Sequence, residues 1–217
     1  MPADEPAATT NPHTDPAVLL LLHGGKAESL APQPRFGLAR LRMRVFGAAV
    51  ERRTGDRALV TVEVEYRHRG WNGRHAHPAA DAVAAVRELA SLAPRAGIAL
   101  LGHSMGGRAA IAAAGHPHVL GAVLLAPWCE DDDPVAHLHG KRIVILHDPA
   151  DRVTSADKSR AFAARARRAG ADVQYMAMPH GGHTMIRGAR TWHRLAARSV
   201  TAILEHRTFQ EVSPNEP

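Results

Sequence analysis

Short apolar runs alternate with amphipathic stretches along most of the chain. The apolar runs are mostly continuous rather than alternating with polar residues, which is typical of β-strands that are covered on both faces. The stretches between them have the length of crossover helices, so the pattern predicts a mostly parallel sheet with helices on both faces. The six predicted strands lie at 17–23, 58–66, 97–103, 120–127, 142–148 and 172–178.

Helix start and stop signals mark several of the stretches between the strands. Pro78 lies near a first turn, where proline is favoured, and Pro94 follows the end of the same stretch. Thr154 and Asp157 have the spacing of a capping box, which predicts a helix that begins at Thr154 and ends at Gly170. The predicted helices of this kind lie at 77–94, 154–170 and 189–207.

The net charge of +6 at pH 7 raises the question of an anionic partner. Arginines cluster at 35–53, where Leu38, Leu41, Val45 and Ala49 recur at helical spacing. This pattern predicts a helix that packs these four apolar residues on the core and leaves its arginines in solvent. A nucleic-acid surface is the less favoured interpretation, because the chain holds only 3 Trp, 2 Tyr and 4 Phe for base stacking.

The composition is that of one globular domain. A chain of 217 residues with 45% apolar and 22% charged residues can bury one substantial core. No apolar run approaches the roughly 18 residues of a membrane helix, and the first residues lack the basic start of a signal peptide. We therefore predict a cytoplasmic protein with a disordered leader at 1–16, one doubly wound α/β domain at 17–207 and a flexible tail at 208–217.

The segment ALLGHSMGGRAAIAAA, at 99–114, holds the first candidate chemistry. Its glycines have the wrong spacing for a dinucleotide fingerprint, and no lysine follows them as a phosphate-binding loop requires. The pattern G-x-S-x-G is matched from Gly102 to Gly106, with Ser104 at its centre. In this pattern the serine occupies a strained turn between a strand and a helix, and the glycines leave room for it. Ser104 is therefore a candidate nucleophile.

A nucleophilic serine also needs a base, an orienting acid and donors for the oxyanion. The loop after the strand at 142–148 offers Asp148 and Asp151, and the loop after the last strand offers His180 and His183. Loops that follow parallel strands meet at the carboxyl edge of the sheet, so these side chains can reach Ser104.

Two amides are the expected oxyanion donors. One belongs to Met105, the residue after the serine, and the other to Gly25, in the loop after the first strand.

Taken together, these segments resemble the α/β-hydrolase family over residues 17 to 206. The first strand ending in HGG, the GHSMGG turn, HDPADRV and GGHT occur in the order of that family. The resemblance implies Ser104 as nucleophile, Asp151 as acid and His183 as base, with His23 and His103 as residues that position loops. His147-Asp148 stands where the family usually has His-Gly, so Asp148 remains an alternative acid. The chain begins at the family's third strand, so we expect a six-stranded sheet that lacks the first two strands.

The resulting hypothesis is a serine hydrolase that cleaves a small-molecule ester or thioester through an acyl-enzyme. Only WCEDDDPVAHLHGK separates two strands where many of these enzymes insert a lid, so the site should be open or covered by loops. Trp71 and Trp128 are candidates for pocket walls or, equally, for loop anchors. The acidic run at 130–133 either disfavours anionic substrates at the rim or is simply solvated.

Two alternatives stay open at this point. An acyltransferase or thioesterase would use the same residues with another acceptor, and a non-catalytic protein would use the scaffold for binding alone. No cofactor is expected. No metal is expected either, because none of the histidine pairs spaced two apart belongs to a group of three ligands at a recognised spacing. These pairs are His75 and His77, His116 and His118, and His137 and His139. Cys129, the single cysteine, excludes an internal disulfide and is expected to be a partly buried small residue. Neither a nucleic acid nor a membrane is an expected partner, and the oligomeric state is left open.

Overall fold

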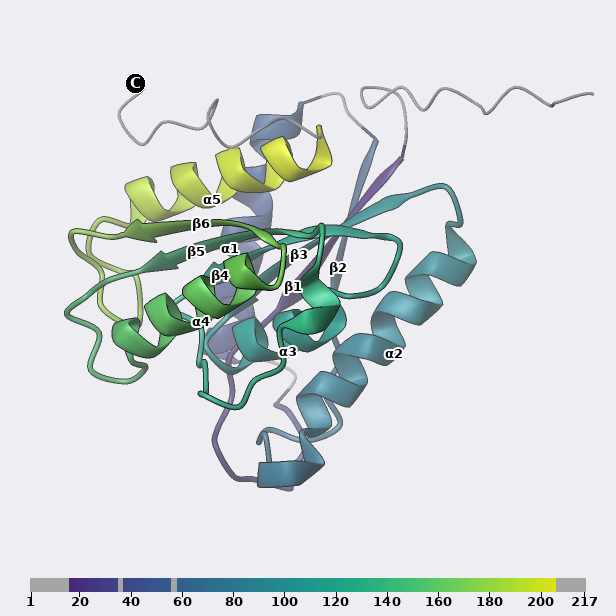
Figure 1. The fold of residues 1–217 in the computed structure, drawn as a ribbon. Helices are drawn as coiled ribbons and strands as arrows, with labels where there is room; N and C mark the ends of the chain where they lie inside the picture. The colour runs from purple at the N-terminus through teal and green to yellow at the C-terminus, as the bar shows by residue number, and fades with distance from the viewer. Residues whose placement is uncertain (1–15, 35–36, 56–57, 206–217) are drawn as a thin grey trace, which may run out of the picture.

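A computed structural model describes residues 16–34, 37–55 and 58–205. The predicted tail and all of the predicted leader except its last residue lie outside these ranges. The described chain forms one sheet of six strands, all parallel, so the predicted fold class and strand number are confirmed (Figure 1). The strands are β1 (Ala17–Leu22), β2 (Leu59–Glu63), β3 (Gly97–His103), β4 (Val119–Leu125), β5 (Arg142–His147) and β6 (Asp172–Ala177).

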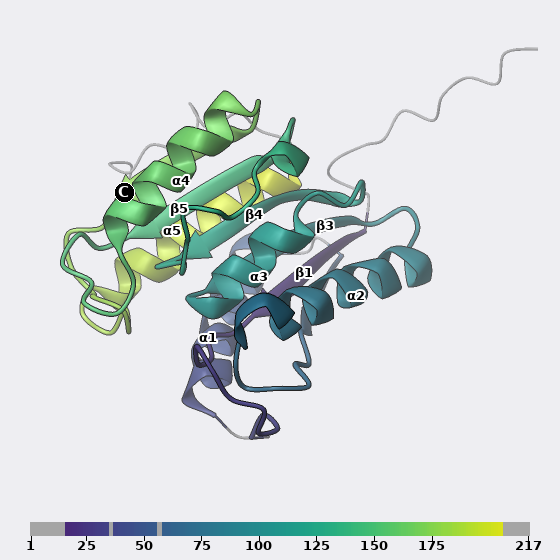
Figure 2. The same cartoon turned by 60° about the horizontal axis from the view of Figure 1, so that its bottom comes forward.

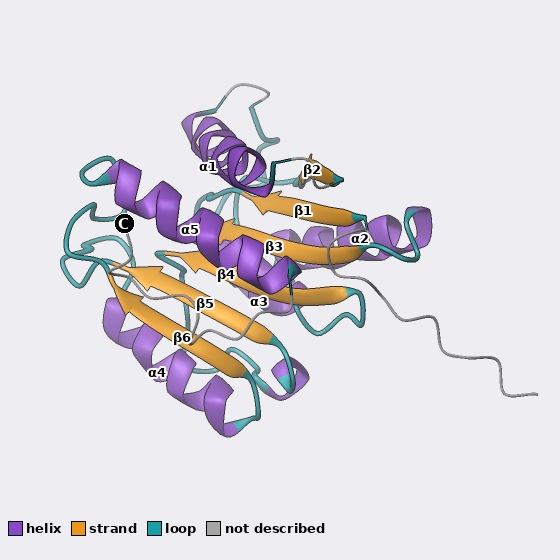
Figure 3. Ribbon diagram, turned by 90° about the horizontal axis from the view of Figure 1, so that it is seen from above, coloured by secondary structure: helices purple, strands orange, loops and turns teal. Residues whose placement is uncertain are grey.

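Five helices cover the two faces of the sheet. Helices α1 (Leu38–Thr54) and α5 (Ala189–Leu204) lie side by side on one face, in front of the strands in Figure 3. The opposite face, turned forward in Figure 2, carries α2 (His77–Leu92), α3 (Met105–Ala113) and α4 (Ala156–Arg168). Alternate strand residues enter the two cores, as the period of a β-strand requires: Leu19 and Leu21 pack on the α1 side, and Leu20 and Leu22 on the α3 side.

The strand order is β2-β1-β3-β4-β5-β6. The chain therefore runs outward from β1 to β2 and then returns to place β3 on the other side of β1. At such a reversal, the loops after the two neighbouring strands diverge to opposite faces and leave a crevice at the carboxyl edge. In this chain those are the loops after β1 and β3, which carry the HGG segment and Ser104.

Helix α1 packs on the core with a different face from the one predicted. Its buried residues are Met43, Phe46, Gly47 and Val50, whereas Leu38, Leu41 and Val45 are exposed. The prediction was wrong because two apolar stripes coexist at helical spacing along this segment. The stripe that contains Phe46 packs into the core. Gly47 lets the helix approach β1 so closely that a Cβ at this position would lie 2.9 Å from the Leu21 side chain.

Helix α4 begins later than the capping-box spacing predicts. Its N-cap is Ser155, whose side chain accepts a hydrogen bond from the Lys158 amide. The hydroxyl of Thr154, the predicted cap, instead lies within hydrogen-bonding distance of the Ala126 carbonyl and the Asp151 carboxylate. Among the described residues, no helix is both long and apolar enough to cross a membrane.

Candidate active site

Ser104 lies on the turn between β3 and α3 in the strained shape that the G-x-S-x-G pattern predicts. Its φ is 56° and its ψ is −120°, and a positive φ is uncommon for a residue with a side chain. The neighbouring glycines are required by space. A Cβ at Gly102 would collide with the Gly106 backbone, one at Gly106 with the Leu22 carbonyl, and one at Gly107 with Pro127.

His183 connects Ser104 to Asp151. Its Nε2 lies 3.0 Å from Ser104 Oγ, and its Nδ1 lies 2.8 Å from Asp151 Oδ2. The Asp151 side chain, from the loop after β5, is fully buried, whereas the His183 side chain, from the loop after β6, is 14% exposed. The structure thus brings a hydroxyl, an imidazole and a carboxylate into one hydrogen-bonded line.

Backbone amides fix the Asp151 carboxylate in place. Its Oδ1 accepts hydrogen bonds from the Val153 amide (2.7 Å) and the Thr154 amide (3.2 Å). Burial acts to raise the pKa of Asp151, but the hydrogen bonds from Val153 and His183 outweigh it and lower the pKa below its usual value. Asp151 is therefore an ionised acceptor, placed to receive a hydrogen bond from His183 Nδ1 when that nitrogen carries a proton.

Asp148, the alternative acid, contacts backbone instead of an imidazole. Its Oδ1 accepts from the Ala150 amide at 2.8 Å, and its Oδ2 accepts from the Gly182 amide at 2.7 Å. The second bond ties the loop after β5 to the loop that carries His183. His180, the other histidine considered, has an exposed side chain, while its carbonyl accepts a bond from the Trp192 indole.

His23 and His103 are buried beside the site and hold its loops. His103 Nε2 donates to the His183 carbonyl at 2.9 Å, and His23 Nδ1 donates to the Gly24 carbonyl at 2.9 Å. Burial lowers the pKa of His103 to about 3, and the nearby charges of His183 and Arg42 act in the same direction. Burial also lowers the pKa of His23. Both imidazoles are therefore neutral near pH 7.

A buried polar chain behind Asp151 was missed by the sequence reasoning. His147 lies with Nε2 3.3 Å from Asp151 Oδ2 and Nδ1 2.9 Å from Ser159 Oγ, and none of its side chain is exposed. Ser159 in turn lies 3.7 Å from the Cys129 sulfur. Burial raises the pKa of the Cys129 thiol to about 12, so this cysteine is a neutral part of the core. The only signal in the sequence for the contact between His147 and Asp151 is their i,i+4 spacing.

The two residues whose amides are expected to bind an oxyanion, Met105 and Gly25, pack against each other beside Ser104. Met105 begins α3, so its N–H has no acceptor within the helix. In the described part of the chain, neither this amide nor that of Gly25 donates a backbone hydrogen bond. Gly25 is packed so tightly that a Cβ there would collide with the Met105 side chain, and one at Gly24 would lie 3.4 Å from Ser104 Cβ. The glycine loop after β1 therefore rests directly on the nucleophile turn.

A cavity of about 470 Å³ opens over Ser104 and His183. The segment between β1 and α1, together with the first turns of α1, forms much of its wall. Leu38 and Val153 bring apolar side chains to it, and both are largely exposed. Between β4 and β5 the chain makes only a short 3₁₀ turn, η2 (Ala136–Leu138), so the site has no cap inserted there. Among the described residues, the Lys and Arg residues that line this cavity are Lys26, Arg40, Arg42 and Arg69.

Trp71 and Trp128, the two aromatic candidates, enclose Arg108 and are not among the residues that line this cavity. The Arg108 guanidinium lies 4.4 Å from the Trp71 ring centre and 5.0 Å from that of Trp128. It also pairs with Asp133 at 2.8 Å. The acidic run likewise stays outside the cavity lining, since Glu130 pairs with Lys158. These contacts fit the interpretation of both tryptophans as loop anchors.

Two of the three pairs of histidines spaced two apart have their rings against each other. The His75 and His77 rings are stacked with centres 5.5 Å apart, and the His116 and His118 rings are tilted with centres 5.6 Å apart. Within the described ranges, no group of three or more His, Cys, Asp or Glu side chains is arranged to hold a metal ion.

Known proteins resemble this chain mainly in fold. Residues 64–144 match the family described as serine aminopeptidase, S33, a segment that includes Ser104 but neither Asp151 nor His183. No curated protein matches the sequence.

Several solved structures are similar over most of their length. An α/β serine hydrolase homologue from Coxiella burnetii has a TM-score of 0.63 at 18% identity, with 86% of this chain and 89% of that chain covered. An α/β-hydrolase enzyme, MGS-M1, from a Medee basin deep-sea metagenome library gives 0.64 at 16% identity, with 93% and 90% covered. A thermophilic esterase from Thermogutta terrifontis gives 0.61 at 18% identity, with 97% and 88% covered.

Proposed function

We propose that this chain, which has the α/β-hydrolase fold, is a serine hydrolase that cleaves carboxylic esters or thioesters of small molecules. The observation that carries the proposal is the line of contacts from Ser104 Oγ through His183 to Asp151, at 3.0 and 2.8 Å. These distances are within hydrogen-bond reach, which is the first requirement for a nucleophile and its general base. The family match and the esterase among the similar structures agree with this chemistry.

The proposed reaction begins with attack of Ser104 Oγ on the substrate carbonyl carbon. His183 Nε2 takes the hydroxyl proton as the new C–O bond forms, and Asp151 stabilises the resulting imidazolium. The amides of Met105 and Gly25 donate to the oxyanion of the tetrahedral intermediate. Collapse of the intermediate breaks the bond to the leaving group, which receives the proton from His183.

Water completes the cycle in the same site. His183 removes a proton from a water molecule that attacks the acyl-enzyme carbonyl, and the acid is released as Ser104 regains its proton. The open cavity admits both a substrate and this water, since no cap covers the described part of the site.

The test is the substitution Ser104→Ala, assayed with 4-nitrophenyl esters of graded acyl length and with 4-nitrophenyl thioesters. We expect kcat of the Ser104→Ala variant to be lower than that of the wild type by at least about 10³-fold. A fluorophosphonate probe should label the wild-type protein at Ser104 and leave the variant unlabelled.

The matched control is Ser155→Ala, which removes a serine hydroxyl at the start of α4, away from the cavity lining. This variant should hydrolyse the esters at the wild-type rate. Undiminished hydrolysis by Ser104→Ala would refute the proposed nucleophile. The absence of both turnover and labelling in the wild type would favour a binding protein on this scaffold.

A further inference from the structure

We propose that the natural substrate carries an anionic group, a carboxylate or a phosphate, which Arg42 binds together with Arg69 and Lys26 while the scissile carbonyl lies at Ser104. This inference rests on the proposed function, because it names the class of substrate for the same cavity.

Among the described residues that line the cavity, Lys and Arg are present, and no Asp or Glu is. Lys26 comes from the loop after β1, Arg69 from the segment after β2, and Arg40 and Arg42 from α1, so three separate parts of the chain supply cations. A concave surface lined by one sign of charge raises the local concentration of oppositely charged ligands and speeds their association.

Arg40 and Arg42 differ in what they contact. The Arg40 guanidinium pairs with Glu63 at 3.0 Å, and Glu63 also pairs with Arg44, so the charge of Arg40 is partly balanced within the protein. Among the described residues, Arg42 has no carboxylate within ion-pair distance. It is half-buried, and burial lowers the pKa of its guanidinium. A partly desolvated arginine without a carboxylate is costly to the folded protein, and an anionic ligand group would offset that cost.

Arg42 shares its cavity with the proposed nucleophile and base, Ser104 and His183. Its charge acts on the buried His103 imidazole that holds the His183 loop. Arginine presents a planar fork of donors that matches the two oxygens of a carboxylate or phosphate. The apolar side chains of Leu38 and Val153, which also line the cavity, can contact the hydrocarbon between such a group and the ester.

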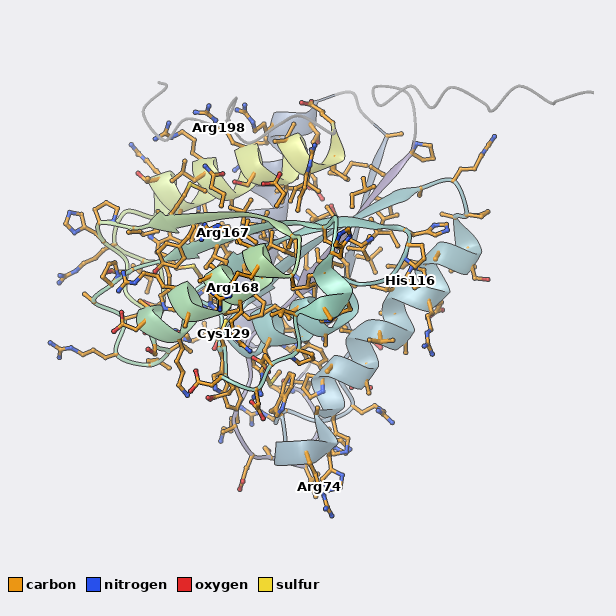
Figure 4. All side chains as sticks on the ribbon, viewed as in Figure 1. Arg74, His116, Cys129, Arg167, Arg168 and Arg198 are labelled. Atoms are coloured by element: carbon orange, nitrogen blue, oxygen red, sulfur yellow. The ribbon has the colours of Figure 1, made fainter. Side chains whose placement is uncertain are left out.

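Arginines are common over the surface, and a second hollow is lined by Arg52, Arg53, Arg190 and Arg194. The cavity described above differs in that its cationic residues share it with Ser104 and His183. Arg74, Arg167, Arg168 and Arg198, labelled in Figure 4, come from the turn before α2, from α4 and from α5, and none of them lines this cavity. The acidic run at 130–133 does not reach it either. The cavity therefore combines a local excess of positive charge with the candidate nucleophile.

The experiment compares esters that differ only in a distant charge. On the acyl side the pair is 4-nitrophenyl hydrogen adipate and 4-nitrophenyl methyl adipate. On the leaving-group side it is 4-acetoxyphenylacetate and its methyl ester. A third pair replaces the adipate carboxylate by a phosphate monoester. Wild type, Arg42→Gln and the control Arg53→Gln are assayed at two salt concentrations. Arg53 is exposed at the far end of the same helix and does not line the cavity.

We expect the wild-type kcat/KM to be about tenfold or more higher for the charged member of at least one pair, and to fall with added salt for that member alone. Arg42→Gln should lower kcat/KM much more for the charged member than for its neutral partner, and so remove most of this preference, whereas Arg53→Gln should behave as wild type. The pair that shows the preference tells whether the anionic group belongs to the acyl part or to the leaving group of the substrate. Comparison of the adipate pair with the phosphate pair tells whether that group is a carboxylate or a phosphate. Equal kcat/KM values within all three pairs, or a preference that survives Arg42→Gln, would overturn the inference.

Failure of the proposed function would look different. If Ser104→Ala keeps full activity, the nucleophile is wrong, but the anion site can still be measured by calorimetry with adipate and with inorganic phosphate. Binding that weakens about tenfold in Arg42→Gln and not in Arg53→Gln supports the site without reference to catalysis. Equal binding by all three proteins overturns it.

Discussion

Asp148 and Asp151 lie three residues apart in the loop that follows β5, yet their carboxylates have different partners. Asp151 accepts from the His183 imidazole and from two amides of its own loop. Asp148 accepts from the Ala150 amide and, across to the next loop, from the Gly182 amide. One carboxylate thus holds a side chain that can carry a proton, and the other holds the backbone next to that side chain. The comparison separates two requirements of the site: the tautomer of His183 and the position of its loop.

Asp151→Asn should have the largest effect, because an amide cannot reliably hold the His183 proton on Nδ1. We expect kcat for a 4-nitrophenyl ester to fall by about 10³- to 10⁴-fold at neutral pH. Steady-state kinetics measure this, with the exposed Asp131→Asn as the control for loss of one carboxylate. A smaller loss in Asp151→Asn than in Asp148→Asn would reverse the roles assigned to the two residues.

Asp148→Ala should affect the loop more than the chemistry. Removing this carboxylate leaves the partly buried amide of Gly182 without its acceptor, which costs up to about 1–3 kcal/mol. We therefore expect the free energy of unfolding to decrease by that amount and kcat to fall by only about tenfold, because His183 keeps its bond to Asp151. Denaturant unfolding and kinetics on the same sample test this. Wild-type stability would show that the Gly182 contact does not hold the loop.

His103 tethers the His183 loop from the other side, and its contribution depends on pH. Its folded pKa of about 3 lies below the ordinary value of 6.5, so between these values the unfolded chain binds a proton that the folded chain excludes. The contribution of His103 to the free energy of unfolding is therefore fully present above pH 6.5. Below pH 6.5 it decreases by about 1.4 kcal/mol for each pH unit of acidification. His103→Gln should reduce that slope when unfolding is measured from pH 6.5 to 4. An unchanged slope would mean that His103 is protonated in the folded protein.

The strands and the turn that carries Ser104 were predictable because their sequence signals are local. Continuous apolar runs identify strands covered on both faces, and the G-x-S-x-G pattern lies within five consecutive residues. The space that requires Gly106 is set by the distant Leu22 carbonyl. Both Asp148 and Asp151 contact a loop some thirty residues further along the chain, and spacing alone does not determine which of them reaches the His183 imidazole. Thr154 is a second residue whose contact the local pattern did not predict. Its hydroxyl donates a hydrogen bond to the Asp151 carboxylate, and Ser155 caps the helix instead.

The role inferred for Arg42 could not be predicted, because it depends on the rotation of α1 about its axis. The sequence offers two apolar stripes, and the choice of the one containing Phe46 leaves Leu38 exposed and brings Arg42 to the cavity. Packing against Leu21 and the T-shaped contact of Phe46 with His193 decide that rotation. Both contacts join segments far apart in the chain, so no local pattern contains them.

The positive φ of Ser104 has a consequence for how this protein can change. A non-glycine residue held in that conformation costs the fold about 1 kcal/mol or more, and the cost stays when alanine replaces serine. Glycine would relieve it, so the most stable residue at this position is one that cannot perform the proposed chemistry. Selection for durability and selection for turnover therefore act in opposite directions at residue 104, and a lineage that no longer needed the activity would gain stability by losing the serine.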